Sequence, residues 1–133
     1  MENLVYILPV FGLIGLVYMA YLYSWVAKQP AGDSKMIEIS DSIAEGAMSF
    51  LKAEYRVLAI FVVIAGVALG LLSTQVDSTH WLIVVAFVLG ALFSVSAGYV
   101  GMKIATKANV RTTNAARTSL KQALRVSFRG GTV

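Results

Sequence analysis

Cysteine is absent from the 133 residues, and histidine occurs once, at His80. These absences exclude disulfide bonds, zinc–thiolate sites and thiol nucleophiles, and a lone His80 beside Trp81 predicts no metal role. The chain also lacks a Walker loop, a nucleophile elbow, a metal-ligand cluster and a cofactor fingerprint. From the residues alone we therefore assign no catalytic, cofactor-binding or metal-binding residue.

Charge is scarce as well. Charged residues make up 14% of the sequence, compared with about 25% in a typical soluble domain. Hydrophobic residues reach 58%, the mean hydropathy is +0.75, and the apolar residues are grouped in long blocks. We therefore predict an all-α, polytopic transmembrane protein that forms a single transmembrane region over residues 1–133. The predicted spans are residues 4–26, 57–72 and 81–102.

Residues 36–72 organise the prediction, because they fit one helix that passes through two environments. Polar residues recur at steps of three and four in the first half, and the stretch from Val57 to Leu72 is apolar on every side. Such a helix would be about 55 Å long, whereas the hydrocarbon core of a bilayer is about 30 Å thick. The helix must therefore protrude into water, where Asp33 or Ser34 can cap its start after the helix-breaking Pro30 and Gly32.

Basic residues predict the orientation. Lys28, Lys35, Lys52 and Arg56 lie between the first two spans, and seven further bases follow the third: Lys103, Lys107, Arg111, Arg117, Lys121, Arg125 and Arg129. The N-terminus and the polar turn at 73–80 contain none. By the positive-inside rule, segments 27–56 and 103–129 face the cytoplasm and the N-terminus faces outward. We expect the protein to be an integral protein of the cell (inner) membrane.

The basic segment after residue 102 extends the third span as a helix, although the poor helix formers Thr112–Asn114 would allow a break. Nucleic-acid binding is not favoured, since Phe128 is the only aromatic residue there. Two other interpretations stay open. The bases can bind anionic lipid head groups, or they can pair with acidic helices while holding this segment in the cytoplasm, and we favour the second.

Acidic residues and small residues give weaker signals. Asp41 and Glu45 are spaced for cation binding or acid–base chemistry, but a solvated helix face explains them better. Glu54 lies on the apolar side and is expected to pair with a base on a neighbouring helix. Aromatic residues at the end of the first span are expected to anchor it at the head groups, and small residues recur where helices could approach closely. These two groups are Tyr18, Tyr21, Tyr23 and Trp25, and Gly12, Gly15, Gly66, Gly70, Gly90, Ser94 and Gly98.

Three stretches resemble the start of the membrane-integral inorganic pyrophosphatases. The most specific is GMKIAT at residues 101–106, which continues as KANVRT at 107–112. The stretch IAEGAMSFL at 43–51, followed by Glu54 and Tyr55, is similar to that family's second helix. Ala116, Arg117, Lys121, Ala123 and the FRGGTV stretch at 128–133 resemble the approach to its fourth helix. The residues from 128 onward thus predict the start of a fourth span in a longer chain.

The resemblance implies a pump that couples hydrolysis of pyrophosphate to transport of H⁺ or Na⁺. It implies an outward-facing N-terminus, a homodimer, Mg²⁺ and in some members K⁺ as cofactors, and the lipid bilayer and the remaining helices of the pump as partners. This chain would supply outer-ring helices, and it would be inactive alone because the family's acidic catalytic motifs lie downstream. The alternative is a small non-enzymatic membrane protein or a transporter subunit.

Overall fold

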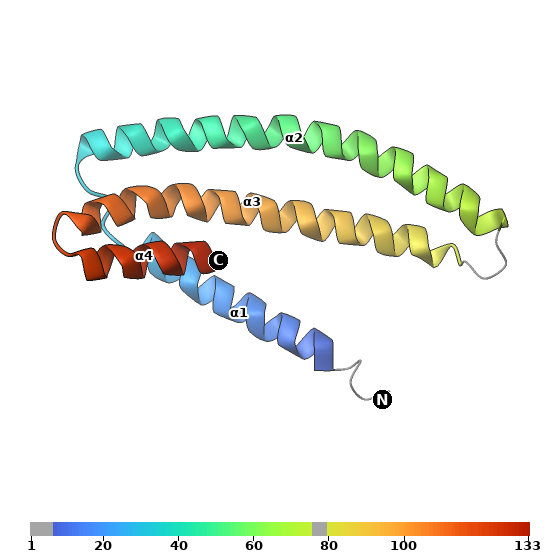
Figure 1. Cartoon of the computed structure of the whole chain (residues 1–133), viewed down its shortest axis with the longest axis horizontal. Helices are drawn as coiled ribbons and strands as arrows, with labels where there is room; N and C mark the ends of the chain where they lie inside the picture. Colours follow the sequence, from blue (N-terminus) through green and yellow to red (C-terminus); the bar gives the residue numbers. More distant parts are fainter. Residues whose placement is uncertain (1–6, 76–79) are drawn as a thin grey trace. The chain divides into compact units, whose positions relative to one another are not determined.

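The computed structural model describes residues 7–75 and 80–133. These residues form four helices, shown in Figure 1: α1 (Ile7–Ala27), α2 (Ser34–Gln75), α3 (Leu82–Ala116) and α4 (Leu120–Thr132). No strand occurs in the described ranges, which confirms the all-α prediction. Helices α1, α2 and α3 are each long and apolar enough to cross a membrane.

Helix α2 confirms that residues 36–72 form one helix, and it extends that helix at both ends. At its start, the Met36 N–H donates to Asp33 Oδ1 over 3.0 Å, so Asp33 is the capping residue. At its far end, Ser73–Gln75 are helical and do not belong to the predicted polar turn. The hydroxyls of Ser73 and Thr74 donate to the carbonyls of Gly70 and Leu71, so the polar side chains are satisfied within the helix. Residues 76–79 of that turn lie outside the described ranges.

The chain leaves the helical conformation between α1 and α2 at Pro30 and Gly32, as the sequence predicted. Gly32 has a φ of +96°, a left-handed conformation that glycine adopts without the steric cost of a Cβ. A Cβ there would lie 2.6 Å from the Met36 sulfur. Residues 4–6 of the first predicted span lie outside the described ranges.

Helix α3 does not break at Thr112–Asn114, so that expectation was wrong by a few residues. The Thr113 hydroxyl donates to the Asn109 carbonyl of its own helix, and the Asn114 amide donates to the Pro30 carbonyl. These bonds accommodate residues with low helix propensity. The chain turns only after Ala116, and Ser119 is in the extended conformation from which α4 begins.

The chain divides into two compact units. The first comprises residues 1–45 and 101–133, of which 7–45 and 101–133 are described. Its centre is a cluster of Val26, Ile104 and Ala108, against which Tyr23, Trp25 and Val133 pack. Helix α4 packs against α1 and buries one stripe of residues, Ala123, Val126 and Gly130.

The second unit comprises residues 46–100 and contains most of the apolar stretches of α2 and α3. The Tyr55 hydroxyl on α2 donates to the Val95 carbonyl on α3 over 2.6 Å. Two of the small residues singled out in the sequence lie at α2–α3 contacts. A Cβ on Gly98 would lie 3.0 Å from the Tyr55 oxygen, and one on Gly70 would lie 4.0 Å from Val84. Large side chains such as Phe61 and Phe93 are exposed, as expected for surfaces that face lipid.

Candidate functional site at the ends of α1, α3 and α4

Arg111 joins the end of α3 to the end of α1. Its Nη2 donates to the Ala27 carbonyl over 3.2 Å, and its Nη1 donates to the Lys107 carbonyl over 2.9 Å. Ala27 is the last residue of α1, and the last carbonyls of a helix have no partner within the helix. A guanidinium at this position satisfies one of them and also complements the negative end of the helix dipole.

Two more residues of α3 and the turn after it hold the α1–α2 connection. Asn114 Nδ2 donates to the Pro30 carbonyl over 3.2 Å, and Arg117 Nη1 donates to Asp33 Oδ2 over 3.0 Å. Arg111 and Asn114 are three positions apart and lie on one face of α3, and Arg117 follows three positions later in the turn. Residues 27–33 are thus bound by Arg111, Asn114 and Arg117, and we call this set the arginine anchor.

Asp33 serves both as the cap of α2 and as the acidic partner in the arginine anchor. The hydrogen bond from the Met36 N–H, together with Arg117, lowers the pKa of Asp33 below its ordinary value of 3.8. Both side chains of the Arg117–Asp33 pair are largely exposed, at 63% and 54%. Water screens such a pair, so it contributes to the position of the connection more than to stability.

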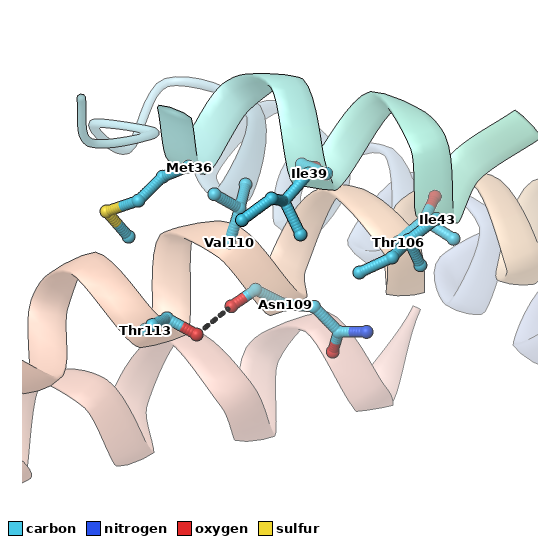
Figure 2. Close-up of a pocket in the computed structure, with 8 residues that line it drawn as sticks. Met36, Ile39, Ile43, Thr106, Asn109, Val110 and Thr113 are labelled. Carbon is cyan, nitrogen blue, oxygen red and sulfur yellow. Dashed lines mark hydrogen bonds between the residues drawn. The ribbon is translucent and has the colours of Figure 1, made fainter. Parts of the chain in front are cut away.

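An apolar groove lies between the first turns of α2 and the last turns of α3 (Figure 2). It has a volume of about 170 Å³ and is lined by Met36, Ile39, Ser40, Ile43, Thr106, Asn109, Val110 and Thr113. The hydroxyls of Thr106 and Thr113 donate to carbonyls of their own helix, as the dashed line from Thr113 shows. The groove therefore contains no acid–base pair and is suited to packing rather than to catalysis.

The family-like run at 101–112 lies at the centre of the first unit. Ile104, Thr106, Ala108 and Val110 are all buried. Ile104 and Ala108 share one face of α3, which packs on Val26 of α1 and, at Ala108, lies against Gly130 of α4. Thr106 and Val110 lie on another face and line the groove toward α2. The run that carries the resemblance is thus the most enclosed part of α3.

Two aromatic residues at the end of α1 contact cationic side chains of other helices, which the sequence did not indicate. Trp25 lies under the guanidinium of Arg129, with 4.1 Å between Cζ and the ring centroid, and Tyr23 lies under Lys107 Nζ at 5.8 Å. Both rings are half-buried and pack on the cluster of Val26, Ile104 and Ala108. Sequence periodicity gives no signal of these contacts, because Lys107 and Arg129 lie 84 and 104 positions beyond Tyr23 and Trp25, on other helices. The role of Tyr18 and Tyr21 as membrane anchors remains a prediction.

The acidic residues that the sequence singled out are not brought together. Asp41, Glu45 and Glu54 are exposed, and Glu54 forms no ion pair within residues 7–75 and 80–133. The part of α3 in the same unit as Glu54, residues 82–100, contains no lysine or arginine. The described ranges also contain no group of three His, Asp or Glu side chains that could hold a metal ion. His80 instead accepts the Leu82 N–H at Nδ1, at the start of α3.

Three long apolar helices, with most of their side chains exposed, define a helical integral membrane protein. Residues 13–133 match the family described as inorganic H⁺ pyrophosphatase, and the chain therefore belongs to that family.

Individual relatives agree with the family. A Clostridium tetani protein is 44% identical over the whole chain. A "K(+)-insensitive pyrophosphate-energized proton pump 2" of Moorella thermoacetica is 42% identical over 96% of the chain and 18% of its own length. A "K(+)-stimulated pyrophosphate-energized sodium pump" of Thermotoga maritima is 41% identical over 96% of the chain and 18% of its own length. The chain spans less than a fifth of the length of these relatives.

Proposed function

We propose that this chain is the N-terminal, outer part of a pump that couples hydrolysis of inorganic pyrophosphate to transport of H⁺ or Na⁺ across a membrane. The observation that carries the proposal is the family match over residues 13–133. The proton-pump and sodium-pump relatives are similar to this chain to nearly the same degree, at 42% and 41% identity. The proposal therefore names both ions.

Within such a pump, these four helices act as a scaffold and do not carry the chemistry. Hydrolysis of pyrophosphate needs carboxylates that hold Mg²⁺ and bases that neutralise phosphate oxygens. The described residues offer no cluster fit for Mg²⁺, so we assign no Mg²⁺ or K⁺ ligand to them. The cofactors, the substrate and the homodimer partner would be bound by the rest of the pump, and the 133-residue chain alone is expected to be inactive.

The proposed orientation places segments 27–56 and 103–129 in the cytoplasm, the N-terminus outside, and the protein in the cell membrane. The distribution of lysine and arginine supports it. Because the chain has no cysteine, a single introduced cysteine reports its own side of the membrane. In intact cells an impermeant maleimide should label Gln75→Cys but label Ser42→Cys only after permeabilisation. The reverse pattern would refute this orientation.

A chimera tests the proposed function. The matching segment of the Thermotoga maritima sodium pump is replaced by residues 1–133 of this chain, and Mg²⁺-dependent pyrophosphate hydrolysis is measured in isolated membranes. We expect hydrolysis well above that of membranes with the segment deleted, because the scaffold would restore assembly. The unmodified pump serves as the reference. A chimera that reaches the membrane in normal amounts but does not hydrolyse pyrophosphate would contradict the proposal.

A further inference from the structure

A second cavity of the first unit, separate from the apolar groove, lies between the end of α1 and the start of α4. It has a volume of about 260 Å³ and is lined by Trp25, Gln29, Ser119, Lys121, Gln122 and Arg125. More of its surface is polar than apolar, in contrast to the groove between α2 and α3. We call it the α1–α4 pocket.

The charge of the α1–α4 pocket is positive and uncompensated. Lys121 and Arg125 are four residues apart, so they project from the same face of α4. Neither forms an ion pair within the described part of the chain, and no acidic residue lines the pocket. Asp33, the acid of the α1–α2 connection, is already paired with Arg117.

The neutral groups of the pocket complement an anion. Ser119 is the residue that precedes α4, but its hydroxyl does not cap the helix and is left for another partner. Gln122, which has a side-chain amide, also lines the pocket, and the first turn of α4 has backbone N–H groups without a partner within the helix. Gln29 is held in place because its Nε2 donates to the Trp25 carbonyl over 3.1 Å. Two cations beside several donors suit the oxygens of a phosphate group.

The position of the pocket indicates where that phosphate comes from. Trp25 lies in the last turn of α1, a helix long enough to span a membrane that ends at Ala27. Tryptophan at the end of a membrane span lies at the level of the head groups, and basic pockets between helices at this level bind anionic lipids. Arg129 does not line the pocket, but its guanidinium lies 4.1 Å from the centroid of the Trp25 ring.

We propose that the α1–α4 pocket binds the phosphate of an anionic lipid head group. Inorganic phosphate shares the same chemistry, so the experiment must separate a lipid from a soluble anion. The proposal does not depend on pyrophosphate hydrolysis. Lipid binding is measured on the full 133-residue chain, so its outcome is independent of the test of the proposed pump.

The test uses Trp25 as the reporter. In a Trp81→Phe background Trp25 is the only tryptophan. The chain is reconstituted in phosphatidylcholine bilayers that contain increasing fractions of brominated phosphatidylglycerol, and quenching of Trp25 is compared with that by brominated phosphatidylcholine. The pocket variant is Lys121→Gln with Arg125→Gln. Its matched control is Lys52→Gln with Arg56→Gln, which removes the same charges at the same spacing from exposed positions on α2.

We expect the unaltered pocket to prefer phosphatidylglycerol, and the pocket variant to bind it about 30-fold more weakly, because each base contributes about a factor of five at an anionic surface. The control should keep the preference, and Lys121→Arg with Arg125→Lys, which keeps both positive charges in the pocket, should keep it too. Equal loss in pocket variant and control, or no preference at all, would overturn the proposal. Loss of the preference on addition of millimolar inorganic phosphate would assign the pocket to a soluble anion and overturn the lipid assignment.

Discussion

The guanidinium of Arg111 reaches the carbonyl oxygen of Ala27 across 84 positions of sequence, with 3.2 Å between Nη2 and the oxygen. This bond ties the end of α1 to α3, while the second nitrogen of the same fork binds the Lys107 carbonyl within α3. Arg111 therefore binds one carbonyl of each of two helices with one planar group. The remaining residues of the arginine anchor extend the same attachment to Pro30 and Asp33.

Substitutions of Arg111 should show that the two-pronged geometry of its guanidinium contributes to stability beyond its charge. Lysine keeps the charge but lacks the two-pronged donor, so Arg111→Lys should lower the free energy of unfolding by about 1.5 kcal/mol, and Arg111→Met by about 3 kcal/mol. Unfolding of the purified chain by SDS in mixed micelles provides the measurement. Arg56→Lys, at an exposed position of α2, is the control and should change little. Equal free energies of unfolding for Arg111→Lys and the unaltered chain would contradict the role of the two-pronged donor in the arginine anchor.

Acid should weaken the start of α2. Because folding lowers the pKa of Asp33, the carboxylate stabilises the fold above its ordinary pKa of 3.8, and this contribution is lost as the pH falls through the lowered value. Asp33→Asn should therefore reduce the pH dependence of stability below about pH 4, and Asp33→Ala should destabilise at all pH values because the cap is also lost. Helicity by circular dichroism over pH 2–6 measures this. Asp41→Asn is the control. The same dependence of helicity on pH for Asp33→Asn and the unaltered chain would refute the prediction.

The contact between Ala108 of α3 and Gly130 of α4 should tolerate no added carbon at position 130. A Cβ on Gly130 would lie 2.5 Å from the Cβ of Ala108, whereas nothing lies within 4 Å of a Cβ on Gly131. Gly130→Ala should therefore destabilise by about 1–3 kcal/mol. Gly131→Ala, the same change one residue later, should be neutral or stabilise by up to about 1 kcal/mol through helix propensity. SDS unfolding measures both, and a stabilised Gly130→Ala variant would contradict the contact.

In the second unit, the Tyr55 hydroxyl should contribute measurably to the α2–α3 contact. It donates to the Val95 carbonyl over 2.6 Å, so Tyr55→Phe should cost about 1 kcal/mol. The control is Tyr21→Phe, since Tyr21 is exposed and its hydroxyl forms no hydrogen bond within the described ranges. A substitution of Val95 would not remove the acceptor, because the acceptor is a backbone carbonyl. The measurement is therefore the free energy of unfolding in SDS, compared between Tyr55→Phe and Tyr21→Phe. Equal effects at Tyr55 and Tyr21 would refute the prediction.

Local features of the sequence were sufficient to predict the first three helices, but not the turn after Ala116 that separates α4 from α3. The break at Pro30 and Gly32, the cap at Asp33 and the continuity of α2 all follow from residues within a few positions of one another. The three apolar helices follow from composition over about twenty residues, the length that a bilayer requires. Helix propensity failed at Thr112–Asn114, where a hydrogen bond to the distant Pro30 carbonyl outweighs a weak local preference.

The sequence by itself thus determined that this is a helical membrane protein, which parts of it are apolar, and which family it resembles, because hydrophobicity and short motifs are properties of neighbouring residues. Only the tertiary structure decided what the bases and aromatics contact: Arg111 with Ala27, Arg129 with Trp25, and Lys121 with Arg125 in one pocket beside α1. The first two pairs join helices that are distant in sequence, whereas Lys121 and Arg125 both lie on α4 and share their pocket with Trp25 of α1. Periodicity gives the face of each helix on which a side chain lies, but only packing selects the helix that faces it.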